Sequence, residues 1–585
     1  MIKSQIKAAL LSAATIALAG CVDDNYDLSN VDTTTRINVN DLVLPVNIDP
    51  IRLDDVISFD ENSKIQPVTM GGKEFYALVQ GGEFSSETIS ISDVRATPTP
   101  INPTRETLRR LVAPESVATR AAAVEFRYPI VEIGNDFSYR SFNIDEAIVS
   151  LDRITTAPFE FKLNLQIEDP HHAIAGMTFT DLVIRSPKGL TATPSTGTYD
   201  PATGLWRIPR VEVVGNHADI SLLATGVDMV TAGVTILPDR SLDFNSEFHI
   251  QTGYVDIVPL RPDFPDEVML VISYGLSDFE VRSFDGQIQY TLDGIDIEPV
   301  NLTDIPDFLA GDETDIHIAN PQIYLQINNP VAGVPLDLRS GMTLTACRDG
   351  EPDLPFTLDA PIDILSRKAA DGLYNFVLSP SDKDLNVPDK FAQGLDWHRF
   401  STLGSLLATP ASWTRKGLPD RIEITLPGAG VPQQRVTGFT LPRTFEAAHG
   451  EYELIAPLAL NDGSKVIYTE VRDGWSDDDL DHLTVTTLKL TAHAVNNCPV
   501  GLQLTVYPID TDGNTIDAKV ESNRLEPNSE TELTIELTGE VRHLDGIRLV
   551  AVLEGGTDDT PLSPEQTLTL TDIRARVSGY YEKEF

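Results

Sequence analysis

The sequence is poor in cysteine and in positive charge. Its 585 residues contain only three cysteines, and no Cys/His cluster has the spacing of a zinc site. Lysine and arginine number 44 against 88 aspartate and glutamate residues, which gives a net charge of −44. Such a chain repels phosphate groups, so its composition argues against nucleic acid and anionic lipid head groups as partners.

Sequence motifs for several kinds of catalysis are missing as well. The chain has no Gly-x-Ser-x-Gly nucleophile elbow, no glycine-rich phosphate loop and no His-Glu-x-x-His. Carboxylates are so frequent that a pair suited to glycoside hydrolysis cannot be recognised. We therefore expect a protein without enzymatic activity or cofactor, and the sequence nominates no catalytic or metal-ligating residue.

Long apolar runs are limited to the first residues. Lys3 and Lys7 precede an apolar stretch over 8–19, which is shorter than the roughly 20 residues of a membrane-spanning helix. Such a pattern, ending in small residues, is typical of a secretory signal peptide over residues 1–20. The residues at its end are Leu18, Ala19, Gly20 and Cys21.

These four residues resemble the lipobox of bacterial lipoproteins. The resemblance implies removal of residues 1–20, a diacylglycerol on Cys21 and acylation of the new amino terminus. Several acyl chains form a stable anchor, so we expect attachment to the outer membrane through this lipid. Acidic residues over 22–27 are similar to the surface-export signal of Bacteroidota lipoproteins, which implies a body facing the cell exterior. A solvated tether is the alternative explanation for them.

The rest of the chain has the pattern of β-strands. Apolar and polar residues alternate without a break over 159–168, 286–293 and 531–538, as expected for strands with one buried and one solvated face. Helical patterns are scarce: the best candidate is 389–407, and 108–111 is a second, short one. The sequence therefore predicts an all-β chain of tandem sandwich domains that follow a lipidated tether.

A diverged repeat supports the tandem arrangement. Three alternating strands each end in an Asx residue at or near a proline, and the markers are Asp169, Asn329 and Asn497, 160 and 168 residues apart. An Asx side chain caps a turn, and proline prevents the strand from continuing. Repetition at domain length indicates copies of one fold.

The first copy contains a further signature. Residues 197–206 read Gly-Thr-Tyr-Asp-Pro-Ala-Thr-Gly-Leu-Trp, and strand-like runs follow at 210–214 and 218–225. This resembles the immunoglobulin-like repeats of bacterial surface proteins. The resemblance implies that Tyr199 and Trp206 face each other across the turn and close one end of the core. The Asx-Pro strand pairs also resemble the sandwich of late-embryogenesis-abundant type-2 proteins.

These features divide the chain into six expected parts. They are a signal peptide (1–20), a tether with a small N-terminal β unit (21–93), a linker (94–123), sandwich 1 (124–260), sandwich 2 with a helical insertion near 389–407 (261–440) and sandwich 3 (441–585). Within the N-terminal unit, we expect a hairpin between 76–79 and 88–91.

A few residues remain open as candidate sites. His171 and His172 in a loop offer metal ligands, although a plain loop is favoured because no third ligand is near. Acidic segments at 510–517 and 475–482 contain oxygens at calcium-like spacing, but a hairpin turn and a solvated loop explain them as well. Cys347 and Cys498 are expected to be buried free thiols rather than a disulfide.

The sequence thus favours a lipid-anchored, non-enzymatic surface protein that acts in binding or assembly through a protein or glycan partner. The first alternative is a glycan-capture lipoprotein, for which Trp397, Trp413 and Trp475 are the candidate sugar platforms. The second is a fimbrial subunit or anchor, released for strand donation by cleavage after Arg36.

Overall fold

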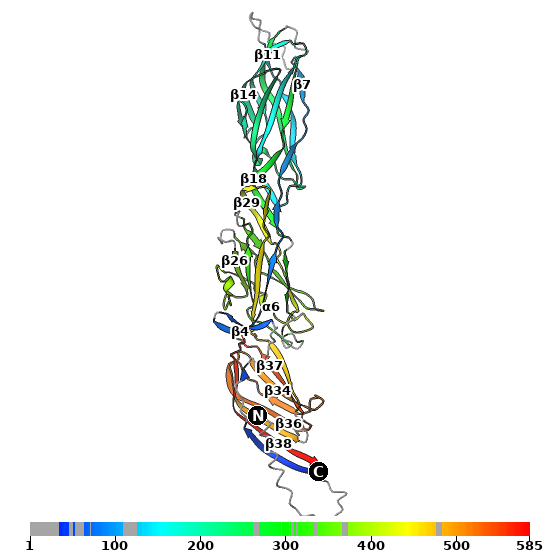
Figure 1. The fold of residues 1–585 in the computed structure, drawn as a ribbon, viewed down its shortest axis with the longest axis vertical. Helices are drawn as coiled ribbons and strands as arrows, with labels where there is room; N and C mark the ends of the chain where they lie inside the picture. Colours follow the sequence, from blue (N-terminus) through cyan, green and yellow to red (C-terminus); the bar gives the residue numbers. More distant parts are fainter. Residues whose placement is uncertain are drawn as a thin grey trace, which may run out of the picture.

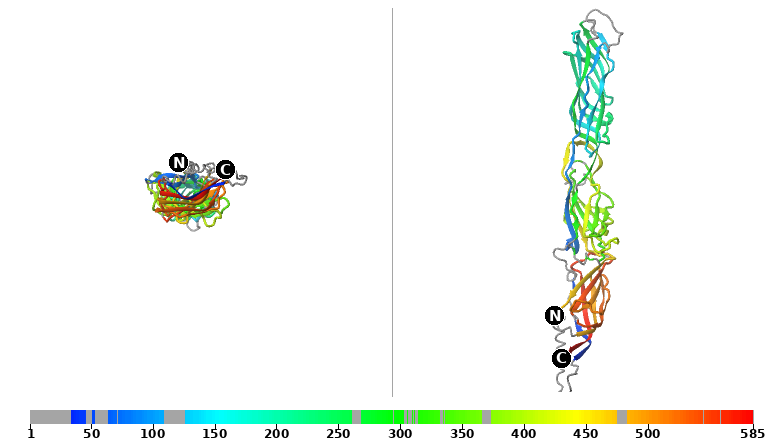
Figure 2. Two further views of the ribbon diagram at one scale, coloured as in Figure 1. Left: turned by 90° about the horizontal axis from the view of Figure 1, so that it is seen from below. Right: turned by 90° about the vertical axis from the view of Figure 1, so that its right-hand side faces the viewer.

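The computed structural model describes residues 34–45, 51–52, 64–70, 72–108, 126–260, 268–293, 295–302, 314–331, 336–365, 373–474, 483–543, 545–557 and 559–584, with four single residues between them. Within these ranges the chain is almost entirely β-strand, which confirms the all-β prediction. The strands build a rod of three lobes stacked end to end (Figure 1 and Figure 2). No helix in the described chain is long and apolar enough to cross a bilayer.

Each lobe has a central strand with one partner on either side. The upper lobe has β10 (Ile148–Glu168) between β15 (His217–Asp228) and β17 (Met269–Leu276). The middle lobe has β21 (Gln322–Asn328) between β26 (Leu373–Ser379) and β31 (His449–Pro457). The lower lobe has β33 (Leu483–Asn496) between β36 (Ser529–Val541) and β38 (Thr567–Glu584).

Each lobe also has a second sheet, and the order in which its strands pair is similar from lobe to lobe. In the upper lobe, β11 (Ile174–Arg185) pairs with β14 (Leu205–Glu212) and β16 (Leu242–Pro259), and β16 pairs with β9 (Ile133–Ser141). In the middle lobe, β23 (Thr343–Cys347) pairs with β24 (Leu354–Thr357) and β28 (Arg421–Thr425), and β28 pairs with β20 (Val300–Asn301). In the lower lobe, β34 (Gly501–Ile509) pairs with β37 (Gly546–Glu554), and β37 pairs with β32 (Lys465–Arg472). Among the described residues the lower lobe has no counterpart of β14 and β24, and the strand pairing of the three lobes is otherwise the same.

The chain crosses between the two sheets of a lobe at the Asx corners. Asp169 accepts hydrogen bonds from the backbone N–H groups of Ala173 and Ile174, both at 2.9 Å. Asn329 accepts one from the N–H of Val331 at 3.0 Å. These bonds hold the turn where the central strand ends, because the Asx oxygen takes the place of a backbone acceptor.

The third corner differs from the expected one by a residue. Asn496, not Asn497, accepts from the N–H of Cys498 at 3.1 Å. Successive side chains of a strand point to opposite faces, so Asn496 is buried while Asn497 is exposed. The sequence located this corner correctly but assigned its role to the wrong asparagine.

The first described residues contribute one strand to each lobe in turn. β1 (Thr34–Pro45) pairs with β38, β4 (Lys73–Ser85) pairs with β31, and β7 (Thr104–Thr107) pairs with β17. This N-terminal segment, residues 34–107, therefore runs along the whole rod before the chain returns through the three lobes. It appears in blue beside the orange lower lobe and the green middle lobe (Figure 1).

The N-terminal segment does not form a unit of its own. The expected hairpin between 76–79 and 88–91 is wrong, because β4 pairs with β3 (Ile65–Met70) and β31, whereas β5 (Ile89–Ile91) pairs with β30 (Arg443–Phe445). The expected linker contains β7 and also β6 (Arg95–Pro98), which pairs with both β9 and β18 (Phe279–Thr291).

The upper and middle lobes share a strand. β18 pairs with β10 along one edge and with β29 (Gly430–Thr440) along the other. One cluster of buried apolar side chains continues from the upper lobe through the middle lobe into part of the lower lobe, which has two further clusters of its own. The upper lobe thus includes β17 and β18, beyond the boundary expected at 260, and the middle lobe includes β31, beyond the boundary expected at 440.

The expected helical insertion is mostly not helical. Between 389 and 407 the chain forms η3 (Asp389–Phe391), β27 (Asp396–Arg399) and α6 (Leu403–Leu406), and β27 pairs in parallel with β26. Gly394 has a φ of 63°, a conformation that ends a helix. The apolar residues of this span are largely buried, as expected, but they project from irregular backbone and short elements rather than from one face of a helix.

The expected contact between Tyr199 and Trp206 is confirmed. The two residues are directly opposite in the pairing of β13 (Thr198–Asp200) with β14. Trp206 is fully buried, and its indole N–H donates to the carbonyl of Thr196 at 2.7 Å. The remaining short elements are β2 (Ile51–Arg52), β8 (Phe126–Pro129), β12 (Leu190–Pro194), β19 (Asp296–Ile297), β22 (Leu338–Ser340), β25 (Ile362–Ile364), β35 (Lys519–Ser522) and α4 (Met229–Ala232).

The two asparagines at the third corner give a matched test. The amide of Asn496 also donates to the carbonyls of Val500 and Glu526 at 3.0 and 2.9 Å. Asn496→Ala should lower the free energy of unfolding by about 2 to 4 kcal/mol in urea titrations, because buried polar groups lose their partners. Asn497→Ala should cost less than about 0.5 kcal/mol, since this side chain is exposed. Equal losses would contradict the assignment.

Candidate functional site

A groove lies on the outer face of the seven-stranded sheet of the middle lobe. Its volume is about 700 Å³, within the roughly 300–1,000 Å³ of typical ligand sites. The residues that line it are Glu83, Phe84, Ser85, Glu298, Gln326, Asn328, Leu373, His449, Gly450 and Glu451. We call it the middle-lobe groove.

The groove exists because only half of this face is covered. On the other half, Tyr324 and Val377 of the sheet are buried with Phe391 of η3 in a small separate core. The rings of Tyr324 and Phe391 stack with centroids 5.7 Å apart. Lys390, next to Phe391, forms ion pairs with Glu451 and Glu453 of β31. The polar half of the face is not covered by this segment.

Strand register aligns the polar side chains in two rows. The first row crosses four neighbouring strands. Its members, in order, are Glu83 of β4, Glu451 of β31, Gln326 of β21 and Asn375 of β26, and each is directly opposite the next. In the second row, two residues along each strand, Ser85 is opposite His449 and Asn328 is opposite Leu373. Because strand side chains alternate between faces, all members of both rows point outward.

Several members of these rows are held in place. The amide of Gln326 donates to Asn375 Oδ1 at 2.9 Å, and the amide of Asn375 donates to the carbonyl of Gln393 at 2.7 Å. Lys390 Nζ lies 3.5 Å from Glu451 and 2.8 Å from Glu453. Burial lowers the pKa of Lys390, but its interactions with these glutamates outweigh burial, so the pKa is raised and the ammonium stays charged.

Asn328 and His449 form a different kind of contact. Asn328 Nδ2 lies 3.3 Å from Nδ1 and 3.2 Å from Nε2 of His449. Near-equal distances to both ring nitrogens mean that the amide lies across the imidazole rather than in line with either nitrogen. This is a weak N–H contact to the ring, and Nδ1 of His449 also lies 3.4 Å from the carbonyl oxygen of Ala447.

The groove can bind a ligand by hydrogen bonds from many directions. It presents carboxylates, amides, a hydroxyl and an imidazole, and its charge is negative. Within the described chain, the side chains of Glu83 and Ser85 form no hydrogen bond or ion pair with another residue. This arrangement suits a polar ligand that carries donors, and it disfavours an anionic one.

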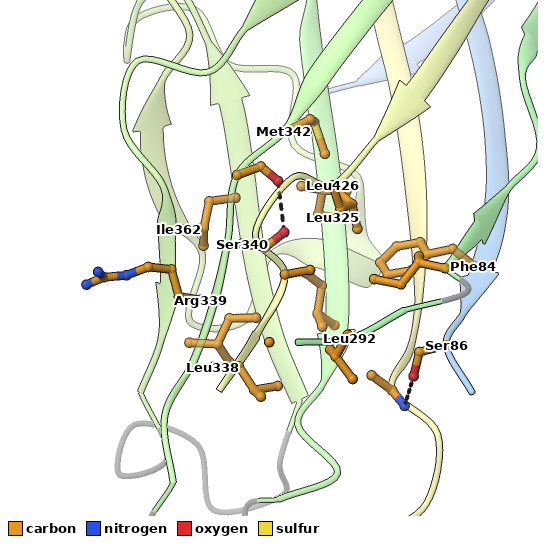
Figure 3. Close-up of a pocket in the computed structure, with 17 residues that line it drawn as sticks. Phe84, Ser86, Leu292, Leu325, Leu338, Arg339, Ser340, Met342, Ile362 and Leu426 are labelled. Atoms are coloured by element: carbon orange, nitrogen blue, oxygen red, sulfur yellow. Dashed lines mark hydrogen bonds between the residues drawn. The ribbon is translucent and has the colours of Figure 1, made fainter. Parts of the chain in front are cut away.

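An apolar cavity lies behind the groove, inside the middle lobe. Figure 3 shows Phe84, Leu325, Leu338 and Ile362 around it, with Arg339 pointing away. Its volume is about 40 Å³ and its lining is almost entirely apolar. Apolar cavities of this size stay dry, so we regard it as a packing gap between the two sheets rather than as a ligand site.

A second polar cluster lies on the upper lobe. Asp136 of β9 is opposite Glu247 of β16, and their carboxylates and His249 lie within 4.8 Å of one another. His249 Nε2 is 2.9 Å from Asp136 Oδ1, and the imidazole lies against Gly134, which has no side chain to exclude it. Exposed acidic groups are common in this chain, so we assign no ligand to the cluster.

The structure places the tryptophan candidates apart. Trp413 is buried, and its indole N–H donates to the carbonyl of Pro352 at 3.0 Å. Trp397 is 38% exposed and lies opposite Val377, so it belongs to the same sheet face as the groove, one row further along. Trp475 lies outside the described residues.

The other sequence candidates do not come together with the groove. His171 and His172 follow β10 at the far end of the upper lobe. Asp510 accepts from the N–H groups of Asp512 and Asn514, so this segment is a turn after β34. The acidic segment 475–482 and the residues Leu18, Ala19, Gly20 and Cys21 lie outside the described residues.

Sequence reasoning missed the middle-lobe groove. Its first row joins residues from β4, β21, β26 and β31, which are far apart in the chain and carry no motif. The only signal was that Glu83, Gln326 and Glu451 occupy polar positions of alternating strands. Such positions are solvent-exposed in every antiparallel sheet, so the signal could not single them out.

The comparisons with known proteins give little further information. No protein-family model and no curated protein matches the sequence. Among solved structures, the chain is similar to a candidate secreted protein from Parabacteroides distasonis, with 13% sequence identity and a TM-score of 0.36, over 52% of this chain and 90% of that chain. A likeness at this score carries no argument about fold or function.

Cys347 and Cys498 are buried free thiols, as expected. Burial raises the pKa of each to about 11, and a hydrogen bond with Asp353 adds to the effect at Cys347. Only about one thiol in a thousand is then a thiolate at pH 8, and the thiolate is the reactive form.

The full chain carrying Cys21→Ser should therefore react very slowly with a disulfide reagent at pH 8. After denaturation, both thiols should react within seconds to minutes, because the unfolded pKa returns to about 8.5. The measurement is the absorbance of the released thiol over time. Fast reaction of two thiols in the folded protein would contradict the burial.

Proposed function

We propose that this protein is a lipid-anchored, non-enzymatic rod that stands off the outer surface of the cell and acts in binding or assembly. The lipid on Cys21 holds it in the outer membrane, and the body faces the exterior. In this proposal the lobes are immunoglobulin-like sandwiches. Their binding partner is a protein or a glycan, and nucleic acid is not a partner.

The observation that carries this proposal is the position of β1. Its first residue, Thr34, is opposite Glu584 at the lower end of the rod (Figure 1). Thirteen residues from Cys21 to Thr34 span at most about 45 Å when fully extended. A lipid on Cys21 would therefore hold the lower lobe close to the membrane and the upper lobe at the distal end.

The construction of the rod suits a protein that holds its distal lobe away from the membrane. β18 is shared by the upper and middle lobes, and the N-terminal segment pairs with all three. β10 alone is 21 residues long, or about 70 Å at 3.3 Å per residue. Shared strands oppose bending between lobes, so the distal lobe is presented at a fixed distance.

The fimbrial alternative has less support. Cleavage after Arg36 would remove only the first residues of β1, and Leu42–Pro45 would remain paired with Val577–Arg574 of β38. Arg36 is also engaged, because its guanidinium lies 3.4 Å from the centroid of the Tyr580 ring. The middle-lobe groove supports the glycan-capture alternative.

The proposal is tested by location. Cys21→Ser should move the protein from the membrane fraction to the soluble fraction, because no lipid can be attached. An epitope tag inserted at Gly215, in the exposed turn between β14 and β15 at the distal end, should bind antibody on intact cells. Membrane retention of the Cys21→Ser protein would contradict the anchor. Tag access only after the outer membrane is permeabilised would contradict the exterior location.

A further inference from the structure

We propose that the middle-lobe groove binds a neutral or amine-bearing saccharide. This inference goes beyond the stand-off role and is independent of the lipid anchor. It rests on the two rows of outward-facing polar side chains, on the charge of the groove and on the pairing of its strands.

The first row supplies acceptors where a saccharide supplies donors. Glu83 and Glu451 are directly opposite each other, and like charges in this position destabilise a sheet. Lys390 offsets the charge of Glu451, but Glu83 has no partner within the described chain. A ligand that donates hydroxyl or ammonium hydrogens to Glu83 relieves this repulsion, whereas a uronic acid or a sulfated sugar increases it.

The pairing of the two central strands argues against a common alternative ligand. A peptide that binds a sheet usually adds as a strand along a free edge. In the groove, β31 lies between β4 and β21, and β21 lies between β31 and β26. Neither β31 nor β21 has a free edge there, so a ligand must contact side chains across several strands.

The groove is also organised before a ligand arrives. Gln326 and Asn375 are fixed by hydrogen bonds, and Lys390 fixes Glu451. Side chains that are already ordered lose little entropy on binding. Trp397 lies on the same sheet face but outside the groove lining, and its indole N–H donates to Ser379 Oγ at 2.8 Å.

The experiment uses the full chain with Cys21→Ser in solution. Neutral, amine-bearing and acidic oligosaccharides are presented as three arms of a glycan array, and hits are measured by calorimetry. Binding should occur in the neutral or the amine-bearing arm and be at least tenfold weaker in the acidic arm. Glu83→Gln and Glu451→Gln should each weaken binding at least tenfold.

Glu74→Gln is the matched control. Glu74 is an exposed glutamate of the same strand as Glu83, outside the groove, so this variant should bind as the parent does. Thermal unfolding shows that each variant is folded. The proposal is overturned if none of the three arms binds, if the acidic arm binds best, or if folded Glu83→Gln and Glu451→Gln proteins bind as tightly as Glu74→Gln. None of these outcomes depends on where the protein resides in the cell.

Discussion

The structure depends on the antiparallel pairing of the N-terminal segment with the last strand of each central triplet. β1, β4 and β7 cover the edges of β38, β31 and β17 in the lower, middle and upper lobes. An uncovered edge exposes a row of unpaired N–H and C=O groups and invites aggregation. The lobes are therefore completed by residues that precede all of them in the chain, and the rod folds as one connected body.

The sequence predicted those features that depend on neighbouring residues. The alternation of apolar and polar residues located β10, β18 and β36, because consecutive residues of a strand point to its buried and its solvated face in turn. The contact between Tyr199 and Trp206 was predictable because a short turn fixes the register of the two strands. The span 389–407 was misjudged, since its apolar spacing fits a helix face while Gly394 and the pairing of β27 with β26 prevent one.

Features that join distant segments left no such signal. Nothing near Lys73–Ser85 indicates that β4 pairs with β31, more than 360 residues later. The middle-lobe groove could not be predicted for the same reason, because Glu83 and Glu451 become neighbours only through the pairing of β4 with β31. The candidate site is thus a product of topology, and its chemistry became recognisable once the register of the strands was known.

The direction of β1 has a mechanical consequence. With a lipid on Cys21, tension between the membrane and the distal lobe would pull Thr34 downward while the rest of the lower lobe pulls β38 upward. The two antiparallel strands would then slide along their length, and all of their cross-strand hydrogen bonds would resist the displacement together. Strands peeled apart sideways lose such bonds one after another. An anchor at Cys21 would therefore load β1 and β38 in shear, the direction in which paired strands resist force best.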